Sequence, residues 1–178
     1  MMEGKKILFL LGLGLLLMPR RASTQDQGQQ SNQSNQNPST FDGNTSYLNQ
    51  PNLPRGIRNN NPGNLKISNS QWLGKHAPNS DGVFEQFTAY KYGVRAMTKL
   101  LINYIASGRD TIDKILNSYS SGSDAYKNYV SQRTGFARNQ ALSDSKENLR
   151  NLVQAMSYFE NGIEAVNNSV FDQAYDLI

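Results

Sequence analysis

Hydrophobic and polar positions in the second half of the chain repeat with the spacing of an α-helix. Apolar residues recur every three or four positions over 88–108, 110–122, 123–135 and 144–162, which predicts four amphipathic helices. A polar residue suited to capping precedes each helix and a glycine follows it. The predicted caps are Thr88, Asp110, Ser123 and Asp144. A short amphipathic helix is also predicted over 163–178.

A different pattern precedes these helices. Residues 54–64 are rich in turn formers, and 64–67 and 83–87 read as two short strands. We therefore predict a β-hairpin with a long irregular connection. The expected fold class is α+β, mainly α, in a single domain that spans residues 53–178.

The N-terminal segment, residues 1–22, is hydrophobic. Its apolar run from Ile7 to Met18 would be about 18 Å long as a helix, whereas a full membrane span needs about 20 residues. That length suits a signal peptide. However, Arg20 and Arg21 occupy the positions where small residues would prepare cleavage, which favours an uncleaved membrane anchor.

Residues 23–52 form a segment dominated by Gln, Asn and Ser. A segment with so few large apolar residues cannot offset the entropy that ordering costs. We predict a disordered linker that tethers the C-terminal domain.

The composition excludes several kinds of chemistry. The chain has no cysteine and a single histidine, His76, which rules out thiol catalysis and disfavours a Ser-His triad or a metal site. We expect no metal and no cofactor. The net charge is +4 and the basic residues are scattered, so nucleic-acid binding has no support. The chemistry must depend on carboxylates, amides and hydroxyls.

Glu160 is the main catalytic candidate. It follows Met156 by four positions on the apolar stripe of the 144–162 helix, and Gly162 ends that helix. Burial and the negative end of the helix dipole both favour a neutral carboxyl group, so we expect a raised pKa. Such a glutamate beside a cleft is suited to act as the general acid in glycosidic cleavage. The alternative is a glutamate that points into solvent.

Several short motifs together resemble a family of phage virion-associated proteins. Members are described as structural proteins or as peptidoglycan-degrading transglycosylases with a lysozyme-like fold. The resemblance spans about residues 54–162. It is carried by Gly56-Ile-Arg-Asn-Asn-Asn-Pro-Gly-Asn64, Trp72 with Gly74, Asp81-Gly82-x-Phe84-x-x-Phe87, Gly93-x-Arg95-Ala96, Thr111-Ile112, Asp124-x-Tyr126 and Glu160-Asn161-Gly162.

The helix ending in Glu160 is also similar to the acid-bearing helix of soluble lytic transglycosylases and goose-type lysozymes. In those enzymes that helix precedes the hairpin, whereas here it follows. Our hypothesis is a circularly permuted lysozyme-like domain. The resemblance implies a lytic transglycosylase or lysozyme-type glycosidase that acts on peptidoglycan glycan strands. The expected location is the virion, attached to a membrane through the N-terminal segment and beside other virion proteins, or otherwise the bacterial cell envelope.

The resemblance also directs attention to the residues around the predicted turn. Amide and guanidinium groups there can bind sugar hydroxyl and acetamido groups, and an aromatic ring can stack on a sugar. Transglycosylation needs one carboxylate, whereas hydrolysis normally needs two, for which Glu85 and Asp81 are the candidates. The alternatives are turn chemistry for the asparagines and core packing for the tryptophan. The predicted substrate-binding residues are Arg58, Asn59, Asn60, Asn64, Trp72 and Glu85.

Three classes of function stay open on the sequence. The first is a peptidoglycan-cleaving virion enzyme that aids cell-wall penetration. The second is a non-catalytic virion structural or wall-binding protein tethered to a membrane. The third is a cellular envelope protein unrelated to phage. The environment of Glu160 in a structure, either buried beside a groove or exposed to solvent, distinguishes a catalytic role from a structural one.

Overall fold

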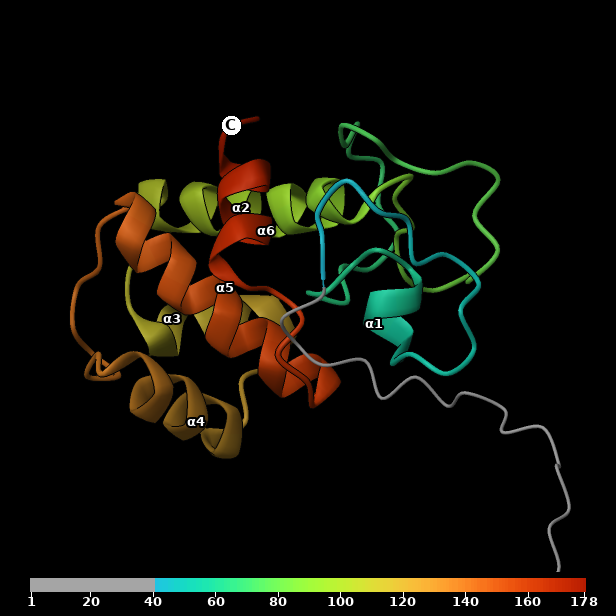
Figure 1. Cartoon of the computed structure of the whole chain (residues 1–178). Coiled ribbons are helices and arrows are strands. Elements are labelled where there is room, and N and C mark those ends of the chain that lie inside the picture. Colours follow the sequence, from blue (N-terminus) through green and yellow to red (C-terminus); the bar gives the residue numbers. More distant parts are fainter. Residues whose placement is uncertain (1–40) are drawn as a thin grey trace, which may run out of the picture. The chain divides into compact units, whose positions relative to one another are not determined.

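The computed structural model describes residues 41–178, which contain six α-helices (Figure 1). None of these helices is both long and apolar enough to cross a bilayer. The predicted anchor at 1–22 and residues 23–40 of the predicted linker lie outside the described part. The helices are α1 (Arg55–Arg58), α2 (Tyr90–Ala106), α3 (Ile112–Ser120), α4 (Asp124–Thr134), α5 (Lys146–Asn161) and α6 (Asn168–Tyr175).

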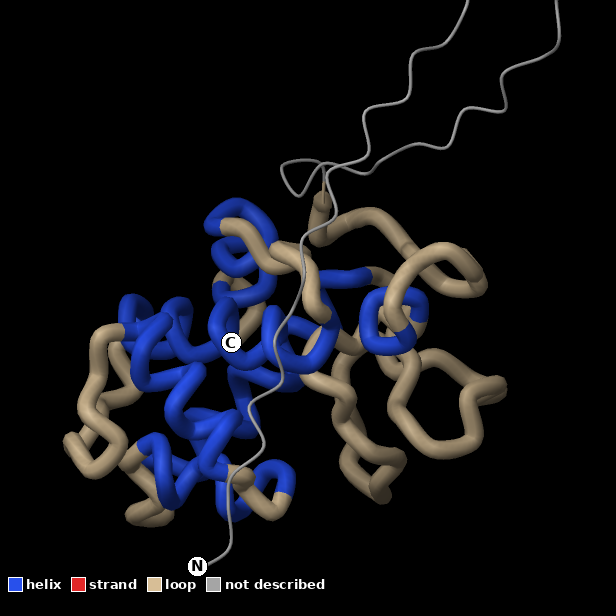
Figure 2. Tube along the Cα trace, turned by 90° about the horizontal axis from the view of Figure 1, so that it is seen from below, coloured by secondary structure: helices blue, strands red, loops and turns tan. Residues whose placement is uncertain are grey.

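The helical part is built around α5. Helix α2 contacts α5 and α6, α4 packs along α5, and α3 contacts both α2 and α4. The buried faces carry the apolar residues that the periodicity predicted, including Met97, Leu101, Leu152 and Met156. Figures 1 and 2 show α2 to α6 gathered on one side, with α1 and the long loops of residues 41–89 on the other.

The helix ends follow local sequence chemistry. Ser123 caps α4 and Gly135 ends it in the left-handed conformation, as predicted. Gly162 likewise ends α5 at φ 72°. Three predicted caps were displaced by one residue. Ala89 rather than Thr88 precedes α2 and makes no side-chain cap, Thr111 rather than Asp110 caps α3, and Ser145 rather than Asp144 caps α5.

The predicted fold class was wrong. Residues 41–178 contain no strand or sheet, only the isolated antiparallel bridges Lys66↔Phe84 and Lys75↔Phe87. The α+β lysozyme-like domain with a β-hairpin, and its circular permutation, are therefore replaced by a helical domain with long irregular loops. Helix α1 was missed, because its Pro-Arg-Gly sequence reads as a turn.

Two features stop the expected hairpin from forming a ladder. Segment 83–88 changes its pairing partner midway, because Glu85 N–H donates to the Leu65 carbonyl whereas Thr88 N–H donates to the Gly74 carbonyl. In addition, the Asn61 amide donates to the carbonyls of both Leu65 and Glu85, at 2.9 Å each. The Asn61 side chain thus shares the Leu65 carbonyl with the Glu85 backbone N–H and binds the Glu85 carbonyl, which a regular ladder would pair with the neighbouring strand.

The folded domain begins earlier than predicted. Phe41 and Tyr47, which the sequence placed in the disordered 23–52 linker, are buried in the main core. The rings of Phe41, Tyr47 and Tyr90 contact one another at centroid distances of 5.1–6.0 Å. The boundary at residue 53 was therefore wrong, since residues 41–52 belong to the domain.

A run of asparagines at residues 59–64, the asparagine turn, connects α1 to the loops and lies directly against α2. Asn60 and Asn64 adopt positive φ angles of 53° and 48°, which asparagine tolerates better than most residues. A Cβ added to Gly93 of α2 would lie 1.8 Å from the Asn60 carbonyl oxygen. Glycine at this position lets the helix backbone touch the turn, and this contact fixes the turn relative to α2.

Candidate functional site

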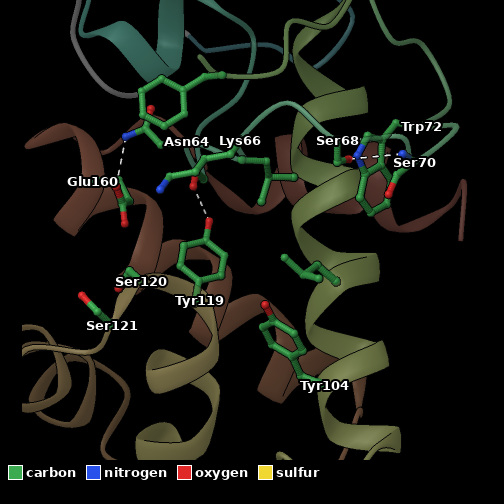
Figure 3. Close-up of a pocket in the computed structure, with 14 residues that line it drawn as sticks. Asn64, Lys66, Ser68, Ser70, Trp72, Tyr104, Tyr119, Ser120, Ser121 and Glu160 are labelled. Atoms are coloured by element: carbon green, nitrogen blue, oxygen red, sulfur yellow. Dashed lines mark hydrogen bonds between the residues drawn. The ribbon is translucent and has the colours of Figure 1, made fainter.

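A pocket of about 620 Å³ is lined by the asparagine turn together with residues of α2, α3 and α5. Its walls come from residues 63–72, from Leu100 and Tyr104 on α2, from Tyr119 at the end of α3, and from Glu160. Figure 3 shows Glu160 and Asn64 at one end and Trp72 at the other. We call this pocket the groove. Its size lies within the range of small-molecule sites.

Glu160 is half-buried in the last turn of α5 and lines the groove. Its Oε2 accepts a hydrogen bond of 3.0 Å from the Asn64 side-chain amide (Figure 3). The Tyr126 phenol also interacts with this carboxyl group. One oxygen is thus held by Asn64 while the carboxyl group lines the groove. A carboxyl group placed in this way can exchange a proton with a bound molecule.

The neighbouring residue fastens the acid-bearing helix to the asparagine turn. The Asn161 amide donates to the Pro62 carbonyl at 2.7 Å and to the Ser157 carbonyl at 2.8 Å. Gly56 packs against the other side of these amides, where an added Cβ would lie 2.3 Å from Asn161 Oδ1 and 2.8 Å from Asn64 Oδ1. Residues 56–64 and the end of α5, which are distant in sequence, therefore meet at Glu160.

Two tyrosines surround Glu160 from the helical side. The Tyr119 hydroxyl donates to the Gly63 carbonyl (Figure 3). Burial raises the pKa of Tyr119 well above its usual value, and the charge of Glu160 raises it further. Burial likewise raises the pKa of Tyr126, with smaller contributions from Tyr119 and Glu160. Both phenols consequently stay protonated at neutral pH and offer hydrogen bonds rather than negative charge.

Glu85, a predicted second carboxylate and substrate-binding residue, does not line the groove. Its side chain is 0% exposed and pairs with Lys75 at 2.9 Å. The same oxygen accepts hydrogen bonds from the Ser68 backbone and hydroxyl. Because its charge is compensated inside the protein, Glu85 holds the 66–75 loop against the 83–88 segment. The structure places it as a support of the groove wall.

Asp81, the other candidate for a second carboxylate, lies in a separate pocket. Its two oxygens accept hydrogen bonds from Arg55 at 2.8 and 2.7 Å, and Asn59 adds a third of 2.8 Å. The Arg55 guanidinium is the main reason that the pKa of Asp81 is held well below its usual range. Within residues 41–178, Glu160 is therefore the only acidic side chain that lines the groove.

The predicted substrate-binding residues divide into three groups. Asn64 and Trp72 line the groove, while Arg58 and Asn59 line the pocket that contains Asp81. Asn60 lines neither pocket. It is fully buried, accepts from Tyr47 N–H at 2.8 Å, and donates to the Phe87 carbonyl at 2.7 Å. In the structure, the Asn60 side chain thus binds backbone groups and stabilises the turn, which is the alternative that the sequence left open.

Other groove residues were not predicted from the sequence. Lys66, Ser68, Ser120 and Ser121 bring further polar groups to its walls. Single lysines and serines in loops carry no spacing signal, so only the fold could identify them. Tyr104 and Tyr119 pack against the core and also line the groove. Within the described part, no cluster of three or more His, Asp or Glu residues is positioned to hold a metal.

Comparison with known proteins identifies a phage relative. The chain is 35% identical over 116 residues to Protein P5 of Pseudoalteromonas phage PM2, an alignment that covers 61% of this chain and 71% of that protein. No family model matches the chain. The chain therefore belongs to the family of this phage protein.

Proposed function

We propose that this protein is a virion component that cleaves peptidoglycan glycan strands, with Glu160 as the catalytic acid. The observation that carries the proposal is the position of Glu160, which is half-buried in a groove of about 620 Å³ with one oxygen held by Asn64. The kinship with a phage protein supports a role in infection. Polar groups along the groove are suited to sugar hydroxyl and acetamido groups.

The arrangement of acids favours transglycosylation over hydrolysis. A hydrolase of the usual kind needs a second carboxylate across the scissile bond, whereas Glu85 and Asp81 are both paired with cations outside the groove. A single carboxyl group suffices if it acts twice. We infer that Glu160 is that group.

In the first step, the Glu160 carboxyl group donates its proton to the glycosidic oxygen and the bond between that oxygen and C1 of the muramyl sugar breaks. In the second step, the Glu160 carboxylate takes the proton of the 6-hydroxyl group of the same sugar. The oxygen of that 6-hydroxyl group then bonds to C1 of the same sugar. The product is a 1,6-anhydro sugar, and Glu160 regains its proton for the next cycle. Asn64 orients the carboxyl group in both steps.

The remaining groove residues bind and position the strand. Trp72 lies at the far end of the groove from Glu160 (Figure 3), where its half-buried ring can stack on a sugar. The serine hydroxyls and Lys66 supply hydrogen bonds along the wall. The Tyr119 hydroxyl holds the Gly63 carbonyl and so keeps the turn beside Glu160.

The test replaces one carboxyl group by an amide of the same shape. Full-length Glu160→Gln is compared with wild type and with Glu164→Gln, an exposed glutamate close in sequence that pairs with Arg133. We expect Glu160→Gln to lower peptidoglycan clearing at least 100-fold, in line with general acid catalysis, and Glu164→Gln to leave it unchanged. Equal clearing by Glu160→Gln would remove Glu160 from the mechanism.

A non-catalytic wall-binding role is the alternative function. It would be favoured if the wild-type protein sedimented with purified cell wall but released no soluble fragments from it. The same preparation therefore decides between the two functions.

A further inference from the structure

A second pocket, of about 360 Å³, is lined by Arg55 and Arg58 of α1 and by residues of the neighbouring loops. Two buried amides form its floor. Asn59 donates to Asp81 and accepts from Gln86 at 3.0 Å, and Gln86 accepts from the Ser80 backbone and hydroxyl. Asn59 and Gln86 are 2% and 3% exposed. We call this pocket the basic pocket, and its floor is held rigid by bonds within the protein.

The basic pocket carries one uncompensated positive charge. Asp81 neutralises Arg55 through two hydrogen bonds. Arg58 also lines the pocket and is half-buried. Within residues 41–178 the Arg58 side chain makes no hydrogen bond or ion pair, and neither does the side chain of Asn49, which also lines the pocket. An arginine fork and an amide are thus available to a ligand.

The basic pocket and the groove share a wall. The Arg55 guanidinium lies 4.6 Å from the centroid of the Phe84 ring, and Phe84 also lines the groove. Gly56, next to Arg55 on α1, contacts the Asn64 side chain that holds Glu160. The two pockets are therefore neighbours in the fold.

We propose that the basic pocket binds a carboxylate of the peptide stems that branch from the glycan strand. This inference rests on the proposed function. Stem peptides are the anionic branches of peptidoglycan, and the planar fork of an arginine matches a carboxylate with two parallel hydrogen bonds. The Asn49 amide donates a third hydrogen bond at the rim. The pocket thereby selects strands that carry peptides over bare glycan.

The test measures binding rather than cleavage. A free stem tetrapeptide is titrated into the full-length protein by calorimetry, and inorganic phosphate is titrated separately as a simple anion. We expect the peptide to bind wild type and Glu160→Gln equally. Arg58→Gln should weaken binding at least tenfold, the usual scale of a charge-assisted hydrogen bond. Arg58→Lys should weaken it less, because the charge remains.

Arg133→Gln is the matched control, since it removes the same charge from α4, outside both pockets, and it should not change peptide binding. The inference is overturned if Arg58→Gln binds the peptide like wild type, or if phosphate binds as tightly as the peptide. These outcomes are independent of the proposed function. Loss of cleavage in Glu160→Gln with no effect of Arg58→Gln on peptide binding would refute only this inference. Peptide binding without any wall cleavage would refute only the enzymatic role.

Discussion

At the level of single residues, side-chain amides make the hydrogen bonds that hold the groove and its surrounding loops in place. Asn64 holds the Glu160 carboxylate, Asn161 holds the Pro62 carbonyl, and Asn61 takes backbone partners that a sheet would otherwise use. An amide carries both a donor and an acceptor without charge. It can therefore fix a loop in a buried place where an ionised group would need a partner.

Gly56 is expected to be essential to this arrangement. Gly56→Ala would place a Cβ 2.3 Å from Asn161 Oδ1 and 2.8 Å from Asn64 Oδ1, so both amides would have to move away. We expect a loss of about 1–3 kcal/mol in unfolding free energy and a lower rate of wall cleavage. Denaturant unfolding and a clearing assay measure the two effects.

Gly82→Ala is the control for Gly56→Ala, because its Cβ would meet no atom within 4 Å. Its positive φ of 76° costs only about 1 kcal/mol of backbone strain, and cleavage should be unaffected. If Gly56→Ala cleaved as well as Gly82→Ala does, the contact at Gly56 would not matter for the site.

Asp81 should make stability depend on pH in strong acid. Its folded pKa is lowered, mainly by Arg55. The stabilisation is therefore complete above the unfolded pKa of about 3.9 and is lost as the pH falls through the lower, folded value. Asp81→Asn should cost about 1–2 kcal/mol at pH 7, because hydrogen bonds to a charged group are lost.

The difference in unfolding free energy between wild type and Asp81→Asn should stay constant from pH 7 to about pH 5 and shrink in stronger acid, below the ordinary aspartate range. Denaturant titrations across this series supply the data. A difference that grew on acidification would have the wrong sign for a lowered pKa.

At the level of elements, helices α2 to α6 were predictable, whereas α1 and the loops were not. Apolar periodicity and the stops at Gly135 and Gly162 located α4 and α5, because a helix satisfies its own backbone and needs little knowledge of its surroundings. The prediction of a β-hairpin over residues 64–87 failed for the opposite reason. Its backbone is satisfied by distant partners such as the Asn61 amide, which no local pattern in the sequence reveals.

Three of the predicted residues line the groove, namely Glu160, Asn64 and Trp72. Glu160 was singled out because it continues an apolar stripe up to a helix stop, and Asn64 because it lies in an unusual turn sequence. The pairing of Glu85 with Lys75 and of Asp81 with Arg55 could not be predicted, because the partners approach through loop geometry. Both pairings change the chemistry, since they remove the candidate second carboxylates from the groove.

The N-terminus of α5 provides a direct test of the observed cap. The Ser145 hydroxyl accepts from Asn148 N–H at 3.3 Å, whereas Asp144 lies outside the helix. Ser145→Ala should therefore lower the unfolding free energy by about 1 kcal/mol, and Asp144→Ala should change it by less than about 0.5 kcal/mol. The reverse order in thermal or denaturant unfolding would restore Asp144 as the cap.

At the level of the whole molecule, the segment at 41–52 closes the core over α2 and α6. Phe41 and Tyr47 pack on Tyr90, and Gln173 of α6 donates to Asp42 at 3.1 Å. The start of the described domain is thus held against α6 by a hydrogen bond between residues more than a hundred positions apart in the sequence.

Tyr47→Ala should therefore destabilise the whole domain. The side chain is 5% exposed, and truncating a buried aromatic costs about 3–5 kcal/mol. Ile178→Ala, at a 41% exposed position, is the control and should cost less than about 1 kcal/mol. If Tyr47→Ala unfolded at the same denaturant concentration as wild type, residues 41–52 would not be part of the folded unit.

The central claim is that one carboxyl group, Glu160, cleaves the glycan strand without help from a second acid. The most direct measurement is mass analysis of the muropeptides that the full-length protein releases from peptidoglycan in water enriched in oxygen-18. The account predicts 1,6-anhydro products that contain no solvent oxygen, and no such products from Glu160→Gln. Reducing ends that carry oxygen-18, or anhydro products released equally by Glu160→Gln, would contradict it.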